Sequence, residues 1–120
     1  MIVAGFGFRS GADVASLRSA LELHAISPDR LATAAAKAED APFVALAQML
    51  GLPVDAVPDD QLAVQPVLTQ SAASQDRYNT GSVAEAAALA VAGPGARLLS
   101  ARVISPDRLA TCAIAIGDAT

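Results

Sequence analysis

Short apolar runs alternate along this chain with segments of helical periodicity, and that alternation restricts the fold to helices layered on a sheet. Apolar strands are predicted at 1–8, 31–36, 54–57, 97–104 and 109–116. Helices are predicted at 12–25, 42–50 and 83–92. The turn Ser105-Pro106-Asp107 joins the last two strands, and so short a joint predicts an antiparallel pair. We therefore expect one domain, residues 1–120, with an α/β fold: a three-layer α/β/α sandwich around a mixed, mostly parallel five-stranded sheet.

Small apolar side chains must fill the interior of this fold. Hydrophobic residues make up 53% of the chain, yet only 3% of residues are aromatic and Trp is absent. Ala, Leu and Val are left to form the core, which favours a close approach of helices to the sheet. In the first helix, Val14, Leu17, Leu21 and His24 recur at spacings of three and four and give one core-facing stripe. Gly51 is expected to end the second helix in a left-handed conformation.

The least regular part of the sequence is 58–78, which is rich in Gln, Ser, Asp and Pro. A turn of helix is predicted around 59–62, and the rest is expected to be a surface loop. This segment is longer than a plain connection needs to be. Its length makes it a candidate for a functional loop.

Charge and cysteine content exclude several classes of function. The formal net charge is −4, without the basic excess and stacking aromatic residues of a nucleic-acid binder. No apolar run approaches the ~18 residues needed to cross a bilayer, and no basic region precedes Ile2 and Val3 as in a secretory signal. Cys112 is the single cysteine and cannot form an internal disulfide. We expect a cytoplasmic protein that binds neither nucleic acid nor membrane.

Two glycine-containing turns each lead into a predicted helix, at 5–11 and at 80–82. In both, a serine is followed three residues later by an acid, Ser10 by Asp13 and Ser82 by Glu85, which is the spacing of a capping box. Glycine beside a helix N-terminus lets a ligand approach free N–H groups, and the helix dipole there favours negative charge. The first turn does not fit the dinucleotide-binding fingerprint, because Ser10 occupies the position of the third glycine. An anionic small molecule other than a dinucleotide is the expected ligand.

Three blocks of sequence together resemble a known family. They are Gly5-Phe6-Gly7-Phe8-Arg9-Ser10-Gly11, Lys37-Ala38-Glu39 and Gly81-Ser82-Val83-Ala84-Glu85-Ala86-Ala87, and the likeness extends over 3–116. In order and spacing they resemble the CobE family, which shares its domain with the C-terminal part of CbiG, the cobalt-precorrin-5A hydrolase of cobalamin biosynthesis. The chain looks like the free-standing CobE form, associated with the oxygen-dependent route. The resemblance implies that a precorrin or corrin acid is the small-molecule partner.

The resemblance and the glycine turns together suggest a binding site for that ligand. Precorrins carry many carboxylates around a flat apolar ring, so a receptor needs donors or cations at the rim and apolar residues against the face. The expected rim cations are Arg9, Lys37, Arg77 and Arg102. The expected substrate-binding residues are Gly7, Arg9, Ser10, Gly11, Lys37, Glu39, Thr80, Gly81, Ser82 and Glu85. The structural alternatives are an ordinary capped helix at Ser82 and a solvated charged turn at 37–39.

Three functions remain open, and the sequence by itself assigns no catalytic residue. The first is binding of a corrin intermediate, with or without chemistry. The second is hydrolysis of the precorrin ring-A lactone, with Glu39 or Glu85 as base and Lys37 stabilising the oxyanion. The third is a structural partner of another cobalamin-pathway enzyme, with 58–78 as the docking surface.

The sequence offers no set of residues that is typical of a metal site or a cofactor site. His24 is the only histidine, is expected to cap the end of the first helix, and is far in sequence from Cys112, which is expected to be a small buried hydrophobe. We therefore expect no metal site and no cofactor. A catalytic serine triad would also have to use His24, so hydrolysis by a serine nucleophile is not expected.

One octapeptide, Ile-Ser-Pro-Asp-Arg-Leu-Ala-Thr, occurs twice, at 26–33 and at 104–111. The first copy follows a predicted helix and the second a predicted strand. Both are interpreted as a proline turn leading into a strand, with no assigned function.

Overall fold

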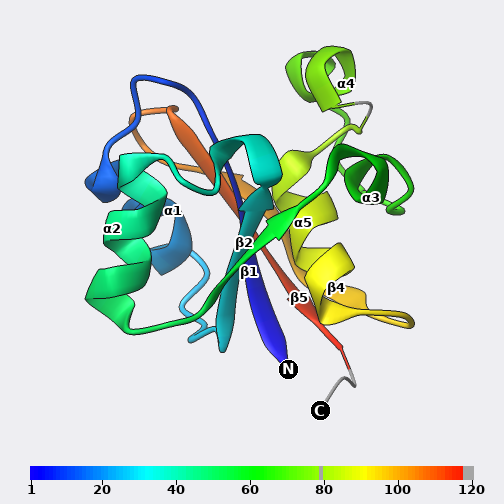
Figure 1. Cartoon of the computed structure of the whole chain (residues 1–120), viewed down its shortest axis with the longest axis horizontal. Helices are drawn as coiled ribbons and strands as arrows, with labels where there is room; N and C mark the ends of the chain where they lie inside the picture. Colours follow the sequence, from blue (N-terminus) through cyan, green and yellow to red (C-terminus); the bar gives the residue numbers. More distant parts are fainter. Residues whose placement is uncertain (79, 118–120) are drawn as a thin grey trace.

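One five-stranded sheet forms the centre of the computed structural model, which describes residues 1–78 and 80–117. The strand order is β3-β2-β1-β5-β4 (Figure 1). The strands are β1 Ile2–Phe8, β2 Arg30–Ala34, β3 Val54–Val57, β4 Arg97–Ile104 and β5 Ala110–Ile116. The helices are α1 Val14–Glu22, the 3-10 turn η1 Ala35–Lys37, α2 Ala41–Leu50, α3 Asp59–Ala63, α4 Ala72–Tyr78 and α5 Val83–Ala92.

The sheet is mixed, as the sequence predicted. Strand β1 lies at its centre, parallel to β2 and antiparallel to β5, so that Ala4 aligns with Leu31 on one side and Ile114 on the other. Strand β2 is parallel to β3, and β4 is antiparallel to β5. Four strands therefore point in one direction and β5 alone in the other. Because neighbours change from parallel to antiparallel at β1, its carboxyl end is where an open α/β sheet usually leaves a crevice.

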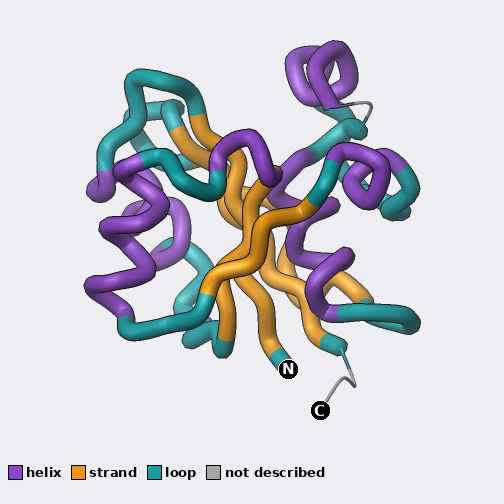
Figure 2. The backbone as a smooth tube through the Cα atoms, viewed as in Figure 1, coloured by secondary structure: helices purple, strands orange, loops and turns teal. Residues whose placement is uncertain are grey.

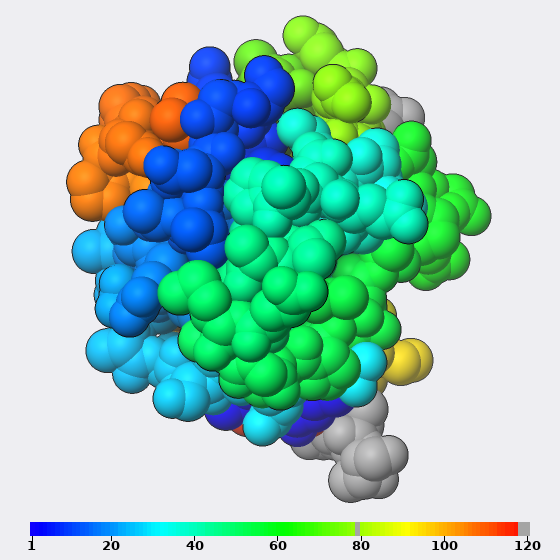
Figure 3. Space-filling view, turned by 60° about the vertical axis from the view of Figure 1, so that its left-hand side comes forward, coloured from blue at the N-terminus to red at the C-terminus, as the bar shows by residue number. Residues whose placement is uncertain are grey.

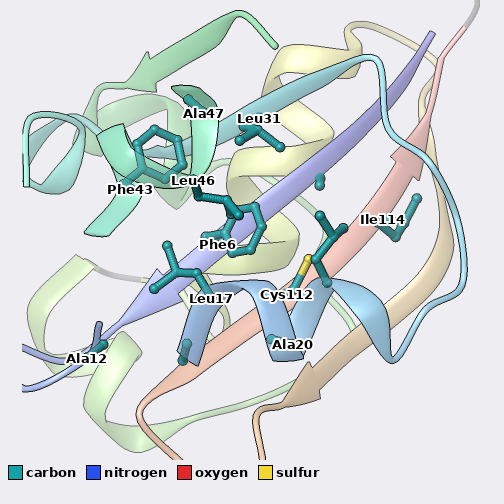
Figure 4. Close-up of a cluster of buried hydrophobic side chains, with 13 residues drawn as sticks. Phe6, Ala12, Leu17, Ala20, Leu31, Phe43, Leu46, Ala47, Cys112 and Ile114 are labelled. Atoms are coloured by element: carbon teal, nitrogen blue, oxygen red, sulfur yellow. The ribbon is translucent and has the colours of Figure 1, made fainter. Parts of the chain in front are cut away.

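Helices cover both faces of the sheet and give the predicted three layers (Figure 2). On one face α1 and α2 bury Leu17, Phe43 and Leu46 against Phe6 of β1 and Ile114 of β5 (Figure 4). The rings of Phe6 and Phe43 meet edge to face with centroids 6.1 Å apart. On the other face, α5 packs on β1, β2 and β5, and seven of the twelve buried residues of this second core are alanines. Phenylalanines thus occupy one core, whereas alanines dominate the other.

The alanine-rich core depends on Gly5. A Cβ atom at Gly5 would overlap the carbonyl oxygen of Ala84 and lie 2.7 Å from the Ala88 nitrogen. Strand β1 and helix α5 therefore touch through their backbones. Gly5, which was predicted to belong to a ligand-binding turn, instead allows α5 to pack closely on β1. Such a close approach was expected from the small side chains of the core.

Two local predictions were wrong. The first capping box does not involve Ser10: helix α1 begins at Val14, and its N-cap is Asp13, whose side chain pairs reciprocally with Ser16. Ser10 lies in the preceding turn, where Ala12 N–H donates to the Arg9 carbonyl. In addition, 72–78 is a helix where a surface loop was expected. It begins directly after Ser71, whose hydroxyl accepts the Ser74 N–H as a capping side chain does.

Candidate functional site

A cleft of about 600 Å³ opens at the carboxyl ends of β1 and β2. Its walls come from the loop after β1, the η1 turn, α4, the first residue of α5 and the turn between β4 and β5. In Figure 3 the loop after β1 (blue), the segment around η1 (cyan) and α4 (yellow-green) gather at one end of the molecule. This volume lies within the range of small-molecule sites.

Positive charge is concentrated in this cleft. Five of the eight lysine and arginine residues of an acidic chain line it. They are Arg9, Lys37, Arg77, Arg102 and Arg108. Asp107 is the one acidic side chain among the described residues that line the cleft. A concave wall with this imbalance attracts and concentrates anions.

Apolar groups lie between these cations. Phe8, Val83, Leu109 and Ala110 line the same cleft. The Phe8 ring stacks on Phe43, with centroids 6.4 Å apart and planes 11° from parallel, so it is held by the core beneath it. The cleft therefore combines cations with a fixed apolar surface, which suits a flat ligand with acidic side arms.

Lys37 is held in place by two neighbours. Its ammonium group lies 5.0 Å from the centroid of the Phe8 ring and 3.8 Å from an Asp40 carboxylate oxygen. Only 17% of its side chain is exposed. The η1 turn places it there, because the chain leaves β2 at Ala34 and turns over the end of β1. Lys37 is thus oriented before any ligand arrives.

Arg77 approaches the cleft from α4. Its guanidinium carbon lies 5.2 Å from the centroid of the neighbouring Tyr78 ring. Tyr78 also lines the cleft, and its hydroxyl is buried without a hydrogen-bond partner in 1–78 and 80–117. The hydroxyl of Thr80 is in the same condition. Two incompletely bonded hydroxyls are therefore found at the end of α4 and just before α5.

Asp107 is committed to local hydrogen bonds. Its carboxylate accepts from the hydroxyls of Ser105 and Ser16 and from the Leu109 N–H. The two hydroxyl bonds and the N–H bond lower the pKa of this carboxyl from its ordinary value. Asp107 therefore fixes the turn between β4 and β5, and with it the neighbouring Arg108.

Glu85 lies inside the protein, outside the cleft. It is 0% exposed, and its carboxylate accepts hydrogen bonds from Leu68, Thr69 and Arg102. Burial opposes its charge, but these bonds outweigh burial and lower the pKa of the carboxyl. In a complete capping box the Glu85 carboxylate would also accept the Ser82 N–H, and that hydrogen bond is not formed here. Half of the predicted capping box is present, since the Ser82 hydroxyl accepts the Glu85 N–H.

The ten residues predicted to bind substrate separate into two groups. Gly7, Arg9, Ser10 and Lys37 line the cleft, whereas Gly11, Glu39, Thr80, Gly81, Ser82 and Glu85 lie outside it. The second glycine turn is not open to a ligand, because Thr69 and Gln70 pack so closely that a Cβ atom at Gly81 would overlap both. Ser82 and Thr80 are buried. The protein's own chain thus covers most of the N-terminus of α5.

Sequence reasoning placed four cations at the rim, and Arg9, Lys37, Arg77 and Arg102 all line the cleft. It missed Arg108, which belongs to the second copy of the repeated octapeptide. That copy was assigned no function. The position of Arg108 in the sequence could have indicated its role. It lies in the turn before β5, and this turn lies next to the end of β1 because the two strands pair antiparallel.

The histidine and the cysteine lie away from the cleft. His24 follows α1, and its ring nitrogens lie 2.9 Å from the Ser100 hydroxyl and 2.7 Å from the Cys112 carbonyl oxygen. It thus ties α1 to β4 and β5, whereas helix capping was expected. Cys112 is buried, and burial raises the pKa of its thiol. Within 1–78 and 80–117, no group of three or more His, Cys, Asp or Glu residues could hold a metal ion. Nor is any helix of these residues long and apolar enough to cross a membrane.

The fold and the cleft define a small three-layer α/β domain with a cation-lined cleft where neighbouring strands change from parallel to antiparallel. A family model described as "Cobalamin synthesis G C-terminus" matches residues 2–115, and the chain belongs to that family. The protein therefore takes part in cobalamin biosynthesis, and the predicted resemblance is confirmed. A comparison with curated proteins gave no match.

Solved structures of the same pathway have this fold. CobE, a protein from the cobalamin biosynthetic pathway, is 32% identical with a TM-score of 0.83, over 96% of this chain and 89% of its own. The cobalamin biosynthesis protein chiG from Agrobacterium tumefaciens str. C58 is 34% identical with a TM-score of 0.72, over 99% and 100%. A cobalamin biosynthesis protein G homologue from Sulfolobus solfataricus is 19% identical with a TM-score of 0.71, over 95% of this chain and 36% of its own. At that identity the likeness concerns the fold alone.

Proposed function

We propose that this protein binds an acidic corrin intermediate, a precorrin or a corrin acid, in the cationic cleft and holds it for the pathway. The observation that carries the proposal is the gathering of five cations around one cleft in a chain of net charge −4. Carboxylate side arms would pair with the cations, and one face of the ring would lie on Phe8 and its apolar neighbours. The oxygen-dependent route is the setting that the likeness to CobE suggests.

The charge distribution supports a ligand with several acidic groups. Arg9 and Lys37 come from the first half of the chain, Arg77 from α4, and Arg102 and Arg108 from the β4–β5 hairpin. The cations therefore come from four separate segments, with Arg9 after β1 and Lys37 in η1, and this spacing suits a ligand whose negative charges are spread around a ring. A single phosphate would need fewer of them, grouped at one point.

The position of the carboxylates favours binding over hydrolysis. Glu85 was one candidate base, but both of its oxygens already accept hydrogen bonds from three backbone N–H groups and one hydroxyl. Glu39, the other candidate, does not line the cleft. Asp107 does, but its oxygens are occupied by three donors and its pKa is lowered, so it is poorly suited to accept a proton near neutral pH. A role as docking partner for another pathway enzyme, and a cytoplasmic location, stay predictions.

A titration with a purified corrin acid tests the proposal. The wild-type protein is expected to form a stoichiometric coloured complex, and the same pigment with esterified side arms is expected to bind much more weakly. Arg9→Glu and Lys37→Glu should each lower the affinity about tenfold or more, since each replaces a favourable charge contact with an unfavourable one. Arg97→Glu, at the start of β4 and outside the cleft, is the matched control and should bind normally.

The other outcomes separate the alternatives. Unchanged affinity after reversal of Arg9 and Lys37 would contradict the proposed site. The resemblance implies that a hydrolase of this family opens the ring-A lactone and expels a two-carbon aldehyde, so release of acetaldehyde with turnover would favour the lactone hydrolase. Absence of any spectral change with the wild-type protein would favour the role of docking partner.

A further inference from the structure

Glu85 is a buried carboxylate with four hydrogen bonds and no role in the cleft surface. Its Oε1 accepts the N–H groups of Leu68 and Thr69 at 2.7 and 2.8 Å. Its Oε2 accepts the Thr69 hydroxyl at 2.7 Å and the Arg102 N–H at 2.9 Å. All four donors are neutral groups. A fully buried carboxylate is costly even when its oxygens are satisfied, so its presence calls for a task other than packing.

The first of the two segments held by Glu85 is the middle of β4. The register between β4 and β5 shifts between Ser100 and Val103, and Arg102 lies within this irregular stretch. Its N–H bonds to Glu85 from there. A bulge of this kind redirects the side chain that it contains, and the Arg102 side chain lines the cleft. The Glu85 carboxylate therefore stabilises the backbone irregularity that places one of the five cations.

The second segment is the start of the connection to α4. Leu68 and Thr69 precede α4 by a few residues, and the Ser71 N–H donates to the Gly81 carbonyl at 2.6 Å. Helix α4 itself has no buried residue. Tyr78 packs against the second core and α4 contacts α3, so the place of α4 along the cleft depends on these contacts and on how the residues before it are attached. Arg77 and Tyr78 reach the cleft from the end of this helix.

We propose that Glu85 is a positioning residue of the binding cleft. Its carboxylate joins β4 at Arg102 to the segment that carries Arg77, and so sets how the two walls stand relative to each other. This role rests on the proposed function, because it concerns the grip on the acidic ligand. Glu85 itself would not touch the ligand.

Amide hydrogen exchange in the unliganded protein tests the clamp without reference to any ligand. In the wild-type protein, the N–H groups of Leu68, Thr69 and Arg102 should be protected. In Glu85→Gln, which keeps the size but offers an amide N–H₂ where Oε2 accepts, these three should exchange about tenfold faster or more. Amides of β1 and β2 should keep their protection. Unchanged exchange at the three positions would overturn the proposal.

A double-mutant cycle with the corrin acid tests the effect on binding. Glu85→Gln should lower the affinity about tenfold, and should cost much less in a protein that already carries Arg102→Ala and Arg77→Ala, because the positioned side chains are gone. Leu89→Val, a buried change on the same helix outside the clamp, is the control for loss of stability and should keep the wild-type affinity. Additive losses, or a normal affinity in Glu85→Gln, would overturn the proposal.

A milder variant covers the case in which Glu85→Gln does not fold. Thr69→Val removes only the hydroxyl bond to Oε2 and should give intermediate changes in exchange and affinity. Unchanged values of both would reject the positioning role. If the wild-type protein bound no corrin acid, the proposed function would fail and with it the ligand role of Glu85, whereas the exchange data would still decide whether the clamp exists.

Discussion

The contact between Gly5 and helix α5 makes the fold sensitive to one methyl group. In Gly5→Ala, the added Cβ would overlap the Ala84 carbonyl oxygen and lie 2.7 Å from the Ala88 nitrogen and 2.9 Å from its Cβ. Ordinary contact begins at 3.4 Å, so clearing the Ala88 nitrogen alone would need a shift of about 0.7 Å, and the closer Ala84 carbonyl oxygen requires the helix to move outward further still. The obstacle is helix backbone, which cannot swing aside as a flexible side chain would.

The expected cost is at the upper end of that seen for overpacked cores, about 3 kcal/mol. For a chain of this length, that corresponds to a fall in Tm of about 10 °C. Thermal and urea unfolding followed by circular dichroism would measure it. Helix α5 spans the second core, and eight of its residues are buried, so the loss cannot be confined to one contact.

Gly11→Ala is the matched control. No atom lies within 4 Å of the position that its Cβ would take, so its stability should change by less than about 0.5 kcal/mol. Equal Tm values for the two variants would refute the close approach of β1 and α5. A loss confined to Gly5→Ala would support it.

Two further predictions concern titratable groups. The pKa values of Glu85 and Asp107 are lowered by hydrogen bonds in the native protein, so the stability that they contribute is complete above the ordinary carboxyl range and is lost as the pH falls through the native values. Urea unfolding should show stability falling below about pH 4.5, the ordinary value for Glu, and Glu85→Gln should show a smaller fall; a parallel pH profile in the two proteins would contradict this. Burial raises the pKa of the Cys112 thiol, and because the thiolate is the reactive form, a disulfide reagent should label the unfolded chain quickly and the native protein very slowly. Prompt labelling of the native protein would contradict the burial of Cys112 in β5.

Much of the architecture could be predicted because it depends on local patterns. All five strands lie within two residues of the predicted bounds, and Gly51 ends α2 with φ of 65° as expected. Asp13 shows where such patterns fail. Both Ser10 and Asp13 are good capping residues, and only the length of the turn after β1 decides which of them begins the helix.

The sequence predicted most of the cations that line the cleft, but it did not predict which other residues form its walls. Lys37 and Arg77 could be placed near a rim because their segments follow strand ends or a long connection. Glu85 could not be placed, since its pattern fits a capping box. Its partners at Leu68 and Arg102 lie 17 residues away on either side. Hydrogen bonds over such distances follow from packing, which no local spacing encodes.

The repeated octapeptide shows most clearly which features follow from the local sequence and which follow from the tertiary structure. In the first copy Arg30 begins strand β2, and Asp29 exchanges bonds with Ile2: its N–H donates to the Ile2 carbonyl and its carboxylate accepts the Ile2 N–H. In the second copy the corresponding Arg108 adopts a left-handed φ of 64°, and Asp107 bonds within its own turn.

The eight residues alone specify an apolar strand after the proline, and both copies form it, but the predicted proline turn forms only in the second copy, at Pro106 and Asp107. The first copy leads into β2, which pairs parallel to β1, and the second leads into β5, which pairs antiparallel to β4. Which of the two arrangements forms depends on the neighbouring strand with which each copy pairs. Periodicity and turn chemistry act over a few residues and are written in the sequence. The choice of hydrogen-bond partner, and with it the shape of the cleft, arises only when distant segments bury each other's polar groups.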